Sequence, residues 1–350
     1  MNAEFFSAIA DIEKEKGIPQ SYMIEKIEQA LLAALKKASP ACQECARVDL
    51  DPENKIVHMY LQKTVADPVE DPSTQISLDT ARKLNAKAEV DDVVNETVDA
   101  KKFGRIAAQA AKQVIIQGIR EAERGIVYDE FTSKEHEILT GIVSRVEQRT
   151  GSVSIQISSN SEFTEAMLLA SERIPTETLR EGDRIKVYVV EVRKSSRGPQ
   201  ILISRTHPGL VKRLFELEVP EIFDGIVEIK SIAREAGSRT KLAVSSSDPE
   251  VDPIGACVGP KGGRVTTIVD ELHGEKIDIV KYSDVVEDYI ASALAPSDVV
   301  GVTILEDGKS CRVVVPDNQL SLAIGKEGQN VRLAARLTGF KIDIKPESGS

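Results

Sequence analysis

Apolar residues recur at three- and four-residue intervals through the first 38 residues, a spacing that predicts two amphipathic helices. The segment Gly17-Ile18-Pro19 should end the first helix, and Ser21 is placed to cap the second. The apolar positions that define the two helices are Phe5, Phe6, Ile9 and Ile12, followed by Ile24, Ile27, Leu31, Leu32 and Leu35.

The pattern then changes to alternating apolar and polar residues, which is typical of half-buried strands. Asp51-Pro-Glu-Asn54 carries turn-forming residues and should join the first two strands as a hairpin. The predicted elements are strands at 47–50, 55–61, 76–78 and 96–98 and a helix near 80–88.

An alanine-rich helix is predicted from Phe103 to Arg124, with one apolar stripe along it. Such a stripe commonly packs into the domain core, but it could also form a docking face for another protein. The pattern leaves both interpretations open. The stripe consists of Ile106, Ala110, Val114, Ile115, Gly118 and Ile119.

Five short strands with turn signals between them follow, at 138–146, 153–157, 163–169, 184–192 and 200–204. Five strands in so short a segment suit a small OB-type barrel, a fold that binds oligonucleotides on one face. Other small barrels would fit the pattern as well. The order of a G-x-V strand, Arg180-Glu-Gly-Asp-Arg184 before a long strand, and Ile-Leu-Ile-Ser-Arg205 resembles the OB fold named after ribosomal protein S-one.

A repeated block near the C-terminus occupies residues 254–280 and 320–345. Each copy contains a G-x-x-G loop between two helical segments and ends in a Lys-Ile-Asp-Ile strand. We call Gly259-Pro260-Lys261-Gly262 the first clamp loop and Gly325-Lys326-Glu327-Gly328 the second. A helix and two strands precede each copy, and this order is the bacterial, type II arrangement of the KH fold, which clamps single-stranded nucleic acid.

The residue types of the two clamp loops suit contact with an RNA backbone. Glycine lacks the Cβ that would keep RNA from the protein backbone, and the N–H groups of the following helix can bind phosphate. Neither loop matches a nucleotide-binding P-loop. Glu327 places a carboxylate in the second loop, where we compare it with Pro260 of the first, so we expect the second loop to contact phosphate more weakly.

Composition restricts where RNA could bind. The chain has 45 basic and 56 acidic residues and a net charge of −11, which argues against indiscriminate nucleic-acid binding. Only residues 131–205 lack an acidic excess. The basic residues of that segment include Arg145, Arg149, Arg184, Arg193, Lys194, Arg197 and Arg205. A binding site must therefore be a local basic stripe on an acidic protein.

The expected RNA-binding residues come from the clamp loops, the helices after them, and basic positions of the barrel and the first KH hairpin. They are Gly259, Pro260, Lys261, Gly262, Gly263, Arg264, Gly325, Lys326, Glu327, Gly328, Gln329, Asn330, Arg332, Arg184, Arg205 and Arg239.

No catalytic, cofactor or metal site is expected. Cys42 and Cys45 form a C-x-x-C pair, but no second pair or nearby histidine completes a tetrahedral zinc site. No apolar run approaches the ~18 residues that a membrane span needs, and the N-terminus lacks the features of a signal peptide. We therefore expect a cytoplasmic protein that has no membrane partner.

The chain resembles the NusA family of transcription factors over nearly its full length. The motifs that carry the resemblance are Ala107-Ala-Gln-Ala-Ala-Lys-Gln-Val-Ile115, Val219-Pro-Glu-Ile222, Asp252-Pro-Ile-Gly-Ala-Cys-Val-Gly-Pro-Lys-Gly262 and Ala323-Ile-Gly-Lys-Glu-Gly-Gln-Asn-Val-Arg332. The fold class expected is α+β and multidomain: an N-terminal α+β domain, a five-stranded OB-type β-barrel and two tandem type II KH domains. The expected boundaries are 1–130, 131–205, 206–281 and 282–346, with a disordered tail at 347–350.

The resemblance implies that residues 1–130 bind core RNA polymerase and that the other domains contact nascent single-stranded RNA, modulating pausing, termination and antitermination. Other Nus factors and ribosomal proteins are further implied partners, and we expect a monomer. KH and OB modules also serve in translation and ribosome maturation, so an RNA-binding protein of that class is the alternative. An RNA-degrading enzyme is a third hypothesis, although the sequence has no recognisable catalytic domain.

Overall fold

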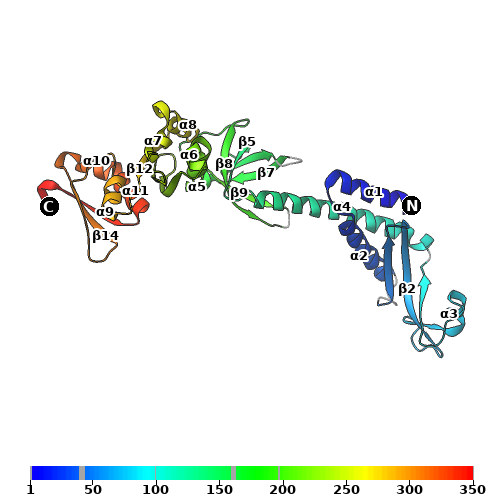
Figure 1. The fold of residues 1–350 in the computed structure, drawn as a ribbon. Helices are drawn as coiled ribbons and strands as arrows, with labels where there is room; N and C mark the ends of the chain where they lie inside the picture. Colours follow the sequence, from blue (N-terminus) through cyan, green and yellow to red (C-terminus); the bar gives the residue numbers. More distant parts are fainter. Residues whose placement is uncertain (1, 39–43, 99, 159–162, 196–197, 350) are drawn as a thin grey trace. The chain divides into compact units, whose positions relative to one another are not determined.

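A computed structural model describes residues 2–38, 44–98, 100–158, 163–195 and 198–349. The chain forms two compact units, Met1–Ile126 and Val127–Ser350, whose elements are labelled in Figure 1. Each unit is described separately below.

The first unit packs helices against a small sheet. Strand β2 pairs antiparallel with β1 and β4 and parallel with β3. Helix α2 begins at Gln20, so the predicted cap residue Ser21 lies inside the helix and that prediction was wrong. The elements are α1 (Asn2–Lys16), α2 (Gln20–Ala38), β1 (Ala46–Asp51), β2 (Ile56–Ala66), β3 (Gln75–Ser77), α3 (Leu78–Leu84) and β4 (Val93–Thr97).

The alanine-rich helix α4 (Ala100–Thr132) is longer than the predicted 103–124. Gly118 is buried against α2, where an added Cβ would lie 3.5 Å from the Met23 sulfur. Ile115 and Ile119 pack on the core of the first unit. Ile115, Gly118 and Ile119 of the stripe therefore face the core, as the packing interpretation expects. The helix continues because Phe131, near its end, is buried in the core of the second unit.

The barrel has the five predicted strands and closes in the order β5-β6-β7-β9-β8. Alternate residues point inward, so Val153, Ile155 and Ile157 of β6 are buried while Gln156 and Ser158 are exposed. The strands are β5 (Ile138–Val146), β6 (Val153–Ser158), β7 (Phe163–Leu168), β8 (Arg184–Arg193) and β9 (Gln200–Ser204), and the short 3-10 helix η2 (Ala170–Glu172) follows β7.

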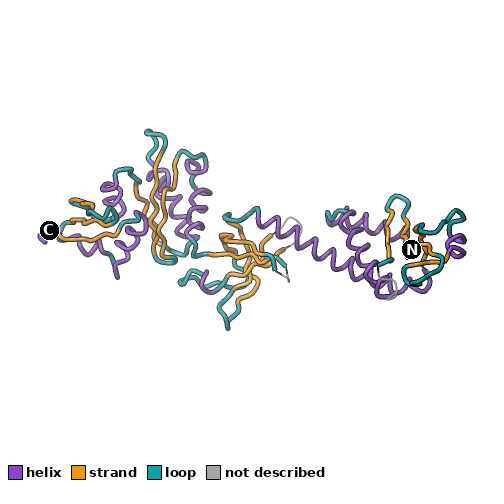
Figure 2. The backbone as a smooth tube through the Cα atoms, turned by 90° about the horizontal axis from the view of Figure 1, so that it is seen from below, coloured by secondary structure: helices purple, strands orange, loops and turns teal. Residues whose placement is uncertain are grey.

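The two KH units share one topology, in which two antiparallel strands are extended by a parallel third strand. Figure 2 shows the strands in orange and the helices in purple. The first unit has α5 (Pro208–Glu218), α6 (Pro220–Phe223), β10 (Val227–Glu235), β11 (Arg239–Ser246), α7 (Pro253–Val258), η3 (Pro260–Gly262), α8 (Gly263–Glu271) and β12 (Lys276–Lys281). The second has α9 (Val286–Ala293), β13 (Gly301–Ile304), β14 (Ser310–Val315), η4 (Asp317–Gln319), α10 (Leu320–Ile324), η5 (Lys326–Gly328), α11 (Gln329–Thr338) and β15 (Lys341–Pro346).

The C-terminal residues differ from the expectation of a disordered tail. Residues Glu347–Gly349 form a 3-10 turn, η6. The backbone N–H of Ser348 donates to Asp317 Oδ1 at 3.1 Å, which ties this turn to the second KH unit.

The C-x-x-C pair lies only partly within the described residues. Cys45 is buried, whereas Cys42 lies outside the described residues. Within the ranges that the structure describes, no group of three potential metal-ligating side chains occurs, and no helix is both long and apolar enough to span a membrane.

Arg205 has no exposed side-chain surface. Its Nε donates to Glu177 Oε2 at 2.8 Å, and its Nη2 donates to the backbone carbonyl of Glu271 at 2.9 Å. Glu271 is the last residue of α8, so Arg205 joins the end of the barrel to the first KH unit. RNA cannot reach a side chain that is fully enclosed, and the prediction that Arg205 binds RNA was wrong.

Arg205→Ala should lower the free energy of unfolding by about 3–5 kcal/mol, because it leaves the buried Glu177 carboxylate without its cation. Arg184 is exposed, and Arg184→Ala should change the same quantity by less than about 0.5 kcal/mol. Urea unfolding followed by circular dichroism measures both. Equal effects of the two substitutions would contradict the structural assignment of Arg205.

Candidate nucleic-acid interface

The two clamp loops have the same backbone conformation. Gly259 and Gly325 have φ of 72° and 77° with ψ of 175° and 171°, and Gly262 and Gly328 are both left-handed. The residue before each second glycine, Lys261 or Glu327, has φ 54° and ψ 26°. Because a non-glycine residue rarely adopts a positive φ, this agreement shows that the surrounding fold imposes one loop geometry twice.

The two loops correspond residue for residue, which corrects the comparison of Glu327 with Pro260 that was made from the sequence. Glu327 occupies the position of Lys261, not of Pro260, and Lys326 occupies that of Pro260. All four side chains are exposed. The first loop therefore presents a cation where the second presents a carboxylate, which strengthens the expectation that the loops are unequal.

The first glycine of each loop is needed for local packing. A Cβ on Gly259 would lie 2.6 Å from Arg264 Cγ, and one on Gly325 would lie 2.8 Å from the backbone nitrogen of Asn330. The second glycine differs, because nothing lies within 4 Å of a Cβ built on Gly328. Only the second glycine therefore leaves the open approach that an RNA backbone would use.

The helices that follow the loops begin at Gly263 and Gln329. No side-chain hydrogen bond caps either helix at its N-terminus. N–H groups in the first turn of a helix bind anions well, since they also lie at the positive end of the helix dipole. Gly262 and Gly328 stand directly before these first turns.

Arg264 and Asn330 follow the two loops at equivalent positions, but neither is presented to solvent as the sequence suggested. Arg264 is half-buried and its Nη1 donates to Glu221 Oε2 at 2.8 Å. Asn330 is buried and its Nδ2 donates to the carbonyls of Leu294 and Ala323, each at 3.0 Å. The predicted RNA contact by Asn330 is wrong, because its side chain supports the loop from inside.

Gln329 and Arg332 are held by the first KH unit. Arg332 Nε and Nη2 donate to the two oxygens of Glu235 at 2.6 and 3.0 Å, and Gln329 Nε2 donates to Glu235 Oε2 at 2.9 Å. The hydrogen bond from Arg332 lowers the pKa of the Glu235 carboxyl from 4.5 to about 2. Glu235 is therefore ionised at neutral pH, and it compensates the charge of Arg332.

Arg239 is also paired. Its Nε and Nη2 donate to the carboxylate of Asp278 at 2.7 and 2.9 Å, and the buried Lys241 donates to the same carboxylate at 3.1 Å. Two hydrogen-bonded cations lower the pKa of Asp278 against the opposing effect of its burial. The aspartate of the first Lys-Ile-Asp-Ile strand thus serves as a structural counter-ion.

The exposed cations of the barrel include Arg145, Arg149 and Arg184. Arg184 begins β8, and its neighbour across the sheet is Ile142 of β5. Arg193 is exposed and paired with Glu191 at 2.6 Å, and Arg197 lies outside the described residues.

Phe163 and Met167 are exposed on β7, and the sequence analysis did not select them. Ala166 and Leu168 on the same strand are buried, so the two-residue period alone places Phe163 and Met167 on the outer face. An exposed aromatic ring on such a barrel can stack with a base of single-stranded RNA. The alternation of apolar and polar positions along β7 was the sequence signal that could have identified Phe163 and Met167 as outward-facing.

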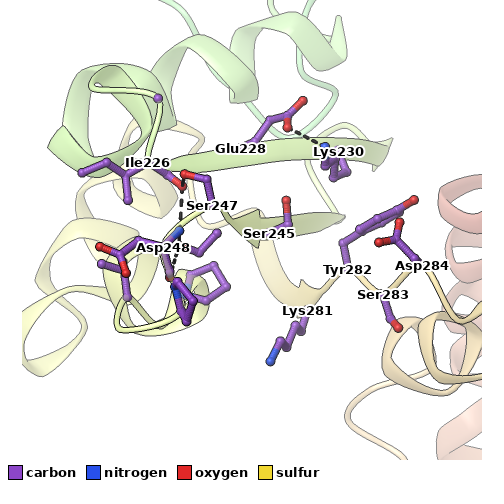
Figure 3. Close-up of a pocket in the computed structure, with 15 residues that line it drawn as sticks. Ile226, Glu228, Lys230, Ser245, Ser247, Asp248, Lys281, Tyr282, Ser283 and Asp284 are labelled. Carbon is purple, nitrogen blue, oxygen red and sulfur yellow. Dashed lines mark hydrogen bonds and ion pairs between the residues drawn. The ribbon is translucent and has the colours of Figure 1, made fainter.

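A cavity of about 540 Å³ lies at one end of the first KH sheet (Figure 3). Its lining mixes charges, since it includes Lys281, Asp248 and Asp284, and Lys230 is paired with Glu228. None of the clamp-loop residues lines it. Its mixed charge gives no preference for an anionic ligand, so the clamp loops remain the candidate site.

Gly325→Ala and Gly328→Ala test the different roles of the two glycines. Gly328 is left-handed, where a Cβ costs about 1–2 kcal/mol. Gly325 combines a positive φ with a ψ of 171°, a backbone region that is essentially confined to glycine. Gly325→Ala should cost more, since its Cβ would also meet the backbone nitrogen of Asn330. Chemical unfolding of both variants gives the comparison, and an equal loss of stability would show that the loop accommodates the extra atom.

Four protein-family models match the chain. They are the NusA N-terminal domain at residues 4–125, the S1 RNA binding domain at 132–204, the NusA-like first KH domain at 205–282 and the NusA-like second KH domain at 286–350.

Three relatives are each called "Transcription termination/antitermination protein NusA". The protein of Halalkalibacterium halodurans is 55% identical over 99% of this chain and 89% of its own length. That of Bacillus subtilis is 51% identical, covering 99% and 92%. That of Mycobacterium bovis is 42% identical, covering 98% and 93%. Together with the four matched domains, these similarities show that the chain belongs to the NusA family of transcription termination/antitermination proteins.

Proposed function

We propose that this protein is a bacterial transcription elongation factor that binds RNA polymerase and nascent single-stranded RNA and so modulates pausing, termination and antitermination. The observation that carries the RNA-binding part is the recurrence of one clamp-loop conformation in two KH units. Membership of the NusA family supports the role in transcription and favours it over the alternative role in translation or ribosome maturation.

The first clamp loop is the stronger phosphate contact in this proposal. Lys261 supplies a cation at the loop apex, and the uncapped first turn of α8 supplies N–H donors beside it. In the second loop, Lys326 attracts phosphate while Glu327 opposes it. The barrel adds Arg184, with Arg145 and Arg149, and Phe163 offers a stacking surface.

The division of labour follows the proposed domains 1–130, 131–205, 206–281 and 282–346. Residues 1–130 bind core RNA polymerase, and the three domains after them contact RNA. Other Nus factors and ribosomal proteins are further partners in this proposal, and the protein acts as a monomer in the cytoplasm. The absence of an acidic excess in the barrel segment supports its contact with RNA.

Opposite charge changes at the two loop apices test the RNA site. Lys261→Glu should weaken binding of a single-stranded oligonucleotide and reduce the salt dependence of its affinity by about one unit of slope, because one phosphate contact is lost. Glu327→Lys should strengthen binding and steepen that slope. Fluorescence anisotropy titrations at several salt concentrations measure both.

Lys309→Glu is the matched control for this experiment, since Lys309 is an exposed lysine in the turn between β13 and β14. It changes net charge by the same amount as Lys261→Glu. If Lys309→Glu weakens binding as much as Lys261→Glu does, the effect comes from overall charge and the clamp-loop site is rejected.

Removal of the first unit tests the polymerase contact. A chain beginning at Val127 keeps Tyr128 and Phe131, which pack on the barrel core, so the second unit should remain folded. This chain should retain RNA binding and lose co-purification with core RNA polymerase. Polymerase capture by the shortened chain at the level of the full chain would contradict the assignment of residues 1–130.

A further inference from the structure

The hairpin between β10 and β11 of the first KH unit contacts the helix that follows the second clamp loop. Glu235 ends β10 and accepts two hydrogen bonds from Arg332, while Ser238 Oγ accepts one from Gln329 Nε2 at 2.7 Å. Gln329 and Arg332 lie in the first turn of α11, directly after Gly328. This hairpin therefore contacts α11 at its N-terminal end, which directly follows the second clamp loop.

Arg332 extends this contact to the loop itself. Its Nη1 donates to the backbone carbonyl of Glu327 at 3.2 Å, so one guanidinium binds Glu235 on one side and the apex of the second loop on the other. A guanidinium is planar and rigid, and its two-point pairing with a carboxylate fixes direction as well as distance. The position of the second loop is thereby tied to the first KH unit.

Arg336 of α11 also faces Glu235, with its Nη1 3.7 Å from Glu235 Oε1. Further contacts between the KH units lie elsewhere on the interface. Ser231 Oγ donates to the carbonyl of Leu337 at 2.9 Å, at the other end of α11, and Lys241 Nζ donates to the carbonyl of Ala295 at 2.7 Å. Ala233 and Ala243 of the first unit pack in the core of the second. These contacts hold the units together without Glu235, so a change at Glu235 acts on the loop end of α11.

We infer that Glu235 is a positioning residue that holds the second clamp loop, through Arg332, at a fixed place relative to the first, so that one RNA strand can engage both loops. This inference rests on the proposed RNA-binding function. A strand bound at one loop meets the second loop at high effective concentration only when the spacing matches the strand. Glu235 would thus raise affinity for long RNA without touching RNA.

The test compares two fluorescein-labelled oligoadenylates on the full chain. One has about 5 nucleotides and fills one clamp, because a KH loop binds about four nucleotides. The other has about 12 and can reach both. Glu235→Gln should weaken binding of the long RNA by about tenfold, the scale of a lost second engagement, and leave the short RNA unchanged.

A double-mutant cycle separates positioning from direct contact. Arg332→Gln should reduce long-RNA affinity as Glu235→Gln does, and the double variant should be no worse than either single variant. If Arg332 instead binds phosphate and Glu235 competes for it, Glu235→Gln will tighten binding and Arg332→Gln will weaken it further in the double variant. Either of those results overturns the inference.

Glu228→Gln is the matched control. Glu228 lies on the same strand β10, and its ion-pair partner is Lys230 (Figure 3), a residue of the first KH unit. It should leave the affinity ratio of the two RNAs unchanged. A drop in that ratio equal to the drop for Glu235→Gln would overturn the inference, because it would show that any loss of charge on β10 has the effect.

Gly328→Asp distinguishes failure of the inference from failure of the proposed function. It adds a side chain and a negative charge to the second loop, so it should weaken long-RNA binding if that loop contacts RNA. If Gly328→Asp weakens binding and Glu235→Gln does not, the inference fails and the RNA-binding function stands. If neither Gly328→Asp nor Lys261→Glu changes binding of either RNA, the proposed function fails.

Discussion

Buried ion pairs at the junctions between the RNA-binding domains are the constraint on which the second unit depends. Arg205 joins the barrel to the first KH unit through Glu177 and Glu271. Arg234 and Glu275 form a second buried pair inside the first KH unit, where the guanidinium donates to both carboxylate oxygens at 2.9 and 2.8 Å. Burying such charges costs several kcal/mol each, and only close, multiple hydrogen bonds offset that cost. Apolar contacts have no preferred direction, so they would tolerate a shift of one domain along the other. The hydrogen bonds of these ion pairs fix direction as well as distance.

Hydrogen-bonded charged side chains also join the two KH units, where one of the contacts is more exposed. Lys241 is buried and bonded to Asp278 and to a carbonyl of the second unit, whereas Arg332 and Glu235 meet near the surface. The burial of these charged junctions therefore falls from the barrel toward the second clamp loop. Since exposed pairs contribute little to stability, the Arg332 contact matters chiefly for geometry.

The backbone elements of this chain were largely predictable, because periodicity and turn residues are local signals. All five barrel strands and both KH repeats followed from the sequence. The side-chain partners did not, since they are far apart along the chain: Arg332 and Glu235 are separated by 97 positions, and Arg205 and Glu271 by 66. The sequence alone does not distinguish a basic residue that faces solvent from one that is paired with a buried carboxylate. Asn330 was wrongly predicted to bind RNA for a related reason: it is buried although its neighbours Gln329 and Val331 are only partly enclosed, and the sequence does not show this difference.

The two clamp loops share one backbone conformation but differ in the charge that they present. Both loops adopt the conformation that opens the second glycine to a ligand, yet their apices carry opposite charges at Lys261 and Glu327. With a net charge of −11, the protein repels nucleic acid at long range, so the proposed RNA binding relies on short-range contacts at the loops and the barrel arginines. A weak second loop adds little affinity by itself. In the proposed arrangement it adds selectivity when it is held in place, because only an unpaired strand of sufficient length would reach it after binding the first loop.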